Sequence, residues 1–228
     1  MNKKKIITLL VAGILTVGIV GGTFAWFTSN DSVTNKFSTA STKEPTNPDA
    51  GIEIEEEFKD EDGDGKYDDD VFPGMTMDKE VTVNSTANYE QFLRVKITKV
   101  WKVGDKEVKY YKEKDDGRIE YYSESEYEDG AKELDYGKIK LNLNNVSDSK
   151  GNTWTDIKSD GYYYYNQILE PEATTEALLK SVTFVQGEND NYYKGLNFEV
   201  IVQAEGIQTT GVTNETESWE CLPQYVYQ

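Results

Sequence analysis

The chain has 228 residues and a formal net charge of −18, and it contains one cysteine and no histidine. A single cysteine cannot form a disulfide within the chain, and without histidine there can be no Ser–His or Cys–His dyad and no histidine-containing zinc site. Strong acidity disfavours nucleic acid and anionic lipid as partners, because both are polyanions. We therefore expect a protein that is not an enzyme and binds no nucleic acid.

Residues 1–25 have the organisation of a secretory signal peptide. Three lysines at positions 3–5 precede an apolar run from Ile6 to Val20, and Gly-Gly-Thr-Phe-Ala follows at 21–25. Glycines and a threonine dilute the run, which falls short of the about 20 apolar residues of a membrane span. We expect cleavage after Ala25, a secreted protein of the extracellular matrix or cell surface, and membrane contact only through the uncleaved signal. A retained N-terminal anchor is the alternative.

Residues 26–50 are predicted to form an extended strand followed by a linker. Val33, Phe37 and Thr39 recur at even spacing, which places them on one face of a β-strand. Two prolines and several turn formers over 43–50 are typical of a linker with nothing to bury. The candidate assembly residues of this segment are Trp26, Phe27, Val33, Phe37 and Thr39.

An acidic loop follows a predicted strand in which Ile52, Ile54 and Phe58 alternate with glutamates. The aspartates of the loop occupy alternate positions and Gly65 takes the sixth place, as in a calcium loop of the EF-hand kind. Position twelve, however, is Val71, where a bidentate glutamate would be expected. The candidate calcium ligands are Asp60, Asp62, Asp64 and Asp68. The sequence favours a solvated acidic turn between strands, with a weak calcium site as the alternative.

Alternating apolar residues and turn formers predict about eight or nine short strands and an all-β, antiparallel β-sandwich. The remaining strands are placed from Val81, over Phe92–Val103, in a hairpin of Val108–Tyr111 with Ile119–Tyr122, and at Ile139–Leu143, Tyr162–Tyr165, from Val182, and at Leu196–Ala204. Lys99 interrupts an apolar face, which suggests a bulge or a local sheet edge. The stretch 174–179 is expected to form a short turn of helix. The tyrosines at 162–165 fit cross-strand packing, with sugar binding as the alternative.

Several stretches resemble one family of secreted proteins. Gly-Gly-Thr-Phe-Ala-Trp-Phe-Thr at 21–28, with Phe-Ser-Thr-Ala at 37–40, is similar to the start of the TasA/camelysin family of biofilm-matrix fibre proteins. The Phe-Pro-Gly turn at 72–74 and the strand at 198–205 are similar to later parts of that family. Residues 161–166 resemble its clostridial, pilin-like branch. The protease activity described for camelysin is not expected here, because the chain lacks a His-Glu-x-x-His arrangement.

The resemblance implies a jelly-roll sandwich over 51–228 and a fibre subunit that polymerises with itself, together with other matrix components. It also implies that the segment 26–42 leaves its own domain after cleavage and adds as a donor strand to the next subunit. A disordered tail on a monomer is the alternative for that segment. The competing function is a monomeric secreted module that binds glycans or calcium. No cofactor is expected apart from the calcium that the acidic loop would hold.

Overall fold

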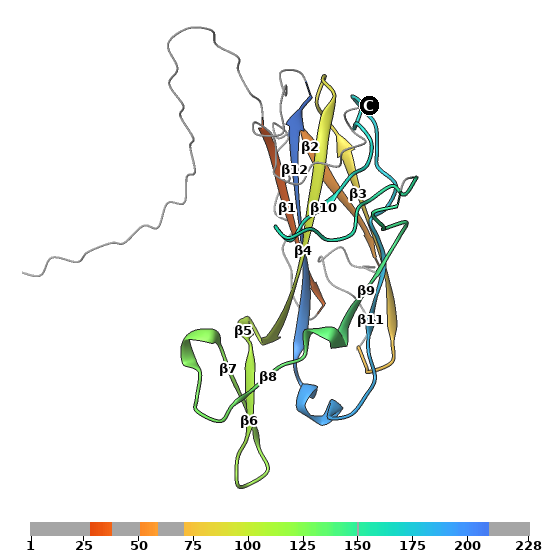
Figure 1. The fold of residues 1–228 in the computed structure, drawn as a ribbon. Helices are drawn as coiled ribbons and strands as arrows, with labels where there is room; N and C mark the ends of the chain where they lie inside the picture. Colours follow the sequence, from red (N-terminus) through yellow and green to blue (C-terminus); the bar gives the residue numbers. More distant parts are fainter. Residues whose placement is uncertain (1–27, 38–50, 59–70, 150, 210–228) are drawn as a thin grey trace, which may run out of the picture.

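The computed structural model describes residues 28–37, 51–58, 71–149 and 151–209 (Figure 1). The described chain is all-β with antiparallel sheets, which confirms the predicted fold class. One sheet contains β1 (Thr28–Phe37), β12 (Asn197–Gln208), β4 (Gln91–Val103) and β10 (Tyr163–Tyr164) in that order, with β5 (Lys106–Val108) paired to β4. A second sheet contains β2 (Ile52–Phe58), β3 (Thr76–Ser85), β11 (Leu179–Phe184) and β9 (Ile139–Leu143) in that order.

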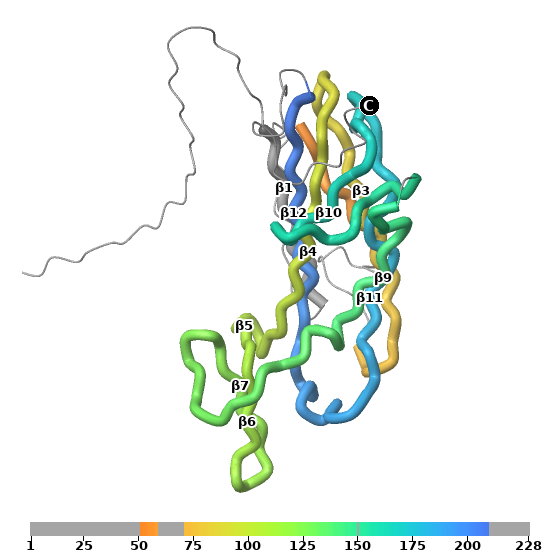
Figure 2. The backbone as a smooth tube through the Cα atoms, viewed as in Figure 1, coloured from red at the N-terminus to blue at the C-terminus, as the bar shows by residue number. Residues whose placement is uncertain are grey.

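A third, smaller sheet extends from one end of the chain's main body, as Figure 2 shows for the segment after β5. Its strands are β6 (Tyr110–Glu113), β7 (Ile119–Tyr122) and β8 (Lys132–Glu133), in the order β7-β6-β8. In the described ranges, short 3-10 helices lie at η1 (Glu124–Glu126), η2 (Tyr136–Lys138) and η3 (Asp190–Tyr193). The β6–β7 hairpin agrees with the prediction, whereas the sequence pattern did not predict β8 as a third strand.

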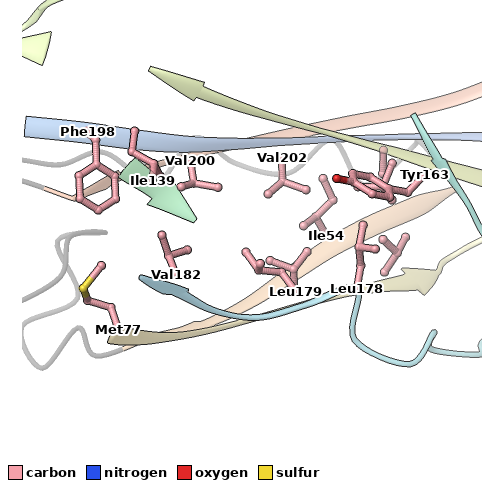
Figure 3. Packing of buried hydrophobic residues seen from close by; sticks show 14 of the residues in the cluster. Ile54, Met77, Ile139, Tyr163, Leu178, Leu179, Val182, Phe198, Val200 and Val202 are labelled. Carbon is pink, nitrogen blue, oxygen red and sulfur yellow. The ribbon is translucent and has the colours of Figure 1, made fainter. Parts of the chain in front are cut away.

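The hydrophobic core lies between the two larger sheets (Figure 3). Strand β12 supplies its inner side chains at every second position, because alternate residues of a strand point to opposite faces. Those side chains are Phe198, Val200, Val202 and Ala204, none of which is more than 2% exposed. The facing sheet contributes Met77, Val81 and Val83 of β3 and Leu179 and Val182 of β11, all at most 1% exposed.

An aromatic cluster fills one end of this core. The ring of Trp101 lies 5.0 Å from Tyr193, 5.7 Å from Phe198 and 5.8 Å from Phe184, centroid to centroid. Its side chain is fully buried. Tilted and edge-to-face ring pairs at these separations add stability beyond the buried area itself.

One local expectation is wrong and another is only half right. Residues 174–179 form no helix: Thr174 makes a bridge to Asn84, and the amide of Leu178 donates to the carbonyl of Val81. Lys99 causes no bulge, since the β4–β12 register runs without interruption past it, but it does lie at a local sheet edge, because in the described ranges β10 and β5 pair with β4 only before and after it. Its Nζ donates to the carbonyls of Tyr136 and Ile139, at 2.7 Å and 3.0 Å. These two hydrogen bonds satisfy the ammonium group of Lys99, so that a lysine is tolerated on the inner face of β4.

Candidate assembly edge

Strand β1 pairs with β12 of the same chain over its whole length. The antiparallel register runs without a break from Thr28 opposite Ile207 to Phe37 opposite Phe198. It places Val33 opposite Val202, whose side chain is in the core. Directly opposed residues of an antiparallel pair lie on the same face of the sheet. The predicted strand over this segment is therefore confirmed, and its Val33 and Phe37 occupy core-facing positions.

β12 depends on β1 for one of its two strand neighbours. On its other side it pairs with β4 from Asn197 opposite Lys102 to Gln208 opposite Gln91. Without β1, the amides and carbonyls along one side of β12 would become an open sheet edge. Open edges of this kind bind extended segments by strand addition.

Several predicted site residues lie outside the described ranges. These are Trp26, Phe27 and Thr39 of the assembly segment, and the acidic-loop residues Asp60, Asp62, Asp64 and Asp68. The calcium hypothesis therefore stays a prediction. Within the described residues, no group of three or more Cys, Asp or Glu side chains is arranged to hold a metal ion. None of the helices in the described ranges has the length and apolar character that crossing a membrane requires.

A buried ion pair lies in the core beside this edge. Lys79 belongs to the inward-facing row of β3, and its Nζ is 3.0 Å from Oε2 of Glu56 in β2. The two side chains are 0% and 5% exposed. The ammonium also lies 5.1 Å from the ring centre of Phe58. Burial lowers the pKa of Lys79, and the attraction and hydrogen bond of Glu56 oppose this shift.

Sequence reasoning missed this pair although a signal was present. Glu56 is the one glutamate in phase with Ile52, Ile54 and Phe58 rather than with the acidic outer face. Lys79 likewise stands in phase with the apolar residues of β3. A charged residue in the apolar phase of each of two paired strands indicates a buried pair, since isolated buried charges are too costly.

An ionic network covers the outer face of the other sheet, which contains β4 and β12. Nε and Nη2 of Arg94 donate to Oε2 of Glu205 at 2.9 Å and 2.6 Å, and the guanidinium lies 4.1 Å over the ring of Tyr162. The Tyr162 hydroxyl donates to the other carboxylate oxygen at 2.7 Å. Burial, followed by this hydrogen bond, raises the pKa of Tyr162 to about 12. These contacts fasten the segment around β10 to β4 and β12.

The tyrosines of that segment pack against both faces of the sheet, as predicted: Tyr163 is paired with the core residue Val95, and Tyr164 is paired with Arg94 of the outer network. Tyr163, Tyr164 and Tyr165 are 7%, 0% and 8% exposed, so they offer no platform on which a sugar could stack. A hollow of about 190 Å³ lies elsewhere, between β6 and η3, where Tyr111 and Tyr192 stack with ring centres 4.6 Å apart. It is smaller than the roughly 300–1,000 Å³ of typical ligand pockets. Neither feature favours the glycan-binding alternative.

No protein-family model, no curated protein and no solved structure matches this chain.

Proposed function

We propose that this chain is the structural subunit of an extracellular fibre of the biofilm-matrix kind, with a sandwich of jelly-roll type. In the fibre, β1 of one copy pairs with β12 of the next, so that the chain polymerises head-to-tail with itself, together with other matrix components. The observation that supports this proposal is the continuous pairing of β1 with β12 at the margin of its sheet. The acidic surface and the N-terminal secretory pattern agree with an extracellular protein.

The pairing of β1 can be exchanged between copies without a change of contacts. The backbone hydrogen bonds and the core-facing positions are the same whichever copy supplies the strand. Residues 38–51 connect β1 to β2, and a chain of that length reaches at most about 45 Å. Such a reach is sufficient for a strand to leave its own sandwich and enter a neighbouring one. A head-to-tail contact of this kind need not close, and it therefore yields filaments.

The joint is strong enough for a durable fibre. Each backbone hydrogen bond contributes about 0.5–1.5 kcal/mol net, and burial of Val33 and Phe37 contributes up to about 1.5–3 kcal/mol each. Pairing within one copy and pairing between copies use the same contacts, so they are close in free energy. Protein concentration then favours the intersubunit form by mass action.

Electron microscopy of two purified proteins tests the proposal. The chain beginning at Trp26 should form filaments at high concentration, whereas a chain beginning at Lys43 should not, because it has an acceptor edge and no donor strand. A synthetic peptide of residues 26–42 should bind the shorter chain and raise its melting temperature without producing filaments. Identical filaments from the shorter chain would refute strand donation by this segment.

A further inference from the structure

The buried Lys79–Glu56 pair belongs to no binding or assembly contact described so far. Two paired strands bring the amine and the carboxylate to 3.0 Å of each other, with both side chains buried. Burial of two charges costs several kcal/mol per ion, and apolar residues of similar size would often be more stabilising. Strand β1 contacts β2 as well as β12. The question is therefore which residue of β1 lies at the level of Lys79 and Glu56.

The contact between Gly206 of β12 and Ile52 of β2 shows which residues of the two sheets lie opposite each other along the strands. A Cβ atom built on Gly206 would lie 3.2 Å from Cγ2 of Ile52, so these two residues face each other across the core. From there, β12 to Val200 and β2 to Phe58 each advance by the same number of residues, which corresponds to about 20 Å along a strand. Figure 3 agrees with this direction, since Ile54 lies toward Val202 rather than toward Phe198.

The strand registers then bring one asparagine to the level of the lysine. Phe58 is paired with Lys79 in the second sheet, and Val200 is paired with Asn35 of β1 in the first. Val200 faces the core, so Asn35 occupies a core-facing position. Asp31, which shares this face, stands four residues further along β1, or about 13 Å away. The registers therefore select Asn35.

We propose that Lys79 and Asn35 form an isopeptide bond, with Glu56 as the group that transfers the proton. The bond fastens β1 covalently to the sandwich that it completes. The bond can form within one chain or between two chains, depending on which copy supplies β1. Only the bond between two chains rests on the proposed function.

The reaction needs only groups of this chain. The neutral amine of Lys79 attacks Cγ of Asn35, a new C–N bond forms, and the bond from Cγ to the side-chain amide nitrogen breaks. Glu56 accepts the proton lost by Nζ and delivers it to the leaving nitrogen, which departs as ammonia. No electron is transferred and no co-reactant is consumed. Burial favours the neutral amine, as in lysine nucleophiles of apolar sites. Fixed neighbouring strands supply the high effective concentration that amide exchange requires.

Intact-mass spectrometry of the folded and then denatured protein tests the bond. The wild-type chain should be lighter than its sequence by one ammonia, and proteolysis should release a branched peptide that joins Asn35 to Lys79. Asn35→Ala should restore the full sequence mass, and Asn35→Asp should change the deficit from ammonia to water. Glu56→Gln should retain the full mass, because it cannot transfer the proton. Asn30→Ala is the matched control: its position is paired with Glu205 on the opposite face, so the deficit should persist.

A folded wild-type chain with its full sequence mass would overturn the proposal, and so would a branch from Lys79 to another residue. The fibre and the bond can fail separately. Filaments that dissolve into monomers of full mass in hot detergent would refute the isopeptide bond but support the fibre. Monomers that carry the mass deficit but never form filaments would refute the fibre but support the bond. Filaments that give a covalent ladder in hot detergent would support both.

Discussion

Gly206 of β12 packs directly against the side chains of Gln91 and Ile52, and we predict that Gly206→Ala is strongly destabilising. A Cβ atom at this position would lie 2.5 Å from Oε1 of Gln91, well inside contact distance. Gln91 is fully buried, and its Nε2 donates to the carbonyl of Gly51 at 2.8 Å and to Oγ of Ser85 at 3.2 Å. The amide cannot move away from the new methyl group without weakening these bonds.

The expected loss follows from these contacts. A buried amide that loses a hydrogen-bond partner costs about 1–3 kcal/mol, and an added methyl group in a packed core costs about 1–3 kcal/mol. The two effects overlap in one displacement, so we expect the free energy of unfolding to fall by about 2–4 kcal/mol for Gly206→Ala. Chemical denaturation followed by tryptophan fluorescence measures this loss, because Trp101 and Trp154 are both fully buried.

Gly187→Ala is the matched control for this measurement. Its Cβ atom would lie 3.5 Å from Nζ of Lys138, an ordinary contact, so its free energy of unfolding should stay within about 0.5 kcal/mol of wild type. The double variant Gln91→Ala, Gly206→Ala should lose less than the sum of the two single losses, because the clash is removed with the amide. A Gly206→Ala protein as stable as the control, or strictly additive losses, would refute the reasoning.

Three further outcomes are expected. Trp101→Ala should lower the free energy of unfolding by about 3–5 kcal/mol in the same denaturation assay, since it empties the centre of the aromatic cluster. The hydrogen bond from Lys138 holds the pKa of Asp190 below its usual range, so the stability that this pair contributes is present above about pH 4 and is lost as pH falls through the lower, folded-state pKa. Asp190→Asn should accordingly make stability less dependent on pH below about pH 4 than in wild type, as denaturation at several pH values would reveal. Calorimetry should detect weak calcium binding by the wild-type chain that is lost in the double variant Asp62→Ala, Asp64→Ala; wild-type heats equal to buffer dilution would leave only an acidic turn.

Local sequence pattern determined the longer strands of this protein and their inner faces, but not the short strands β5 and β8. The alternation over 52–58, 92–103 and 196–204 predicted β2, β4 and β12, because the two-residue period of a strand is written directly in the chain. The same period predicted the strand that contains Val33 and Phe37. It failed over 174–179, where good helix formers are held extended by hydrogen bonds to β3 that the local sequence cannot reveal.

Tertiary structure alone decided which strands are neighbours, and with that the candidate site. Alternation states which face of a strand is buried but not which strand it pairs with, since pairing joins residues as distant as Val33 and Val202. For the same reason, Lys79 and Glu56 looked like two separate charges in apolar patterns until β2 and β3 brought them together. A buried charge is tolerable only beside its partner, and the partner's position is a property of the fold rather than of the local sequence.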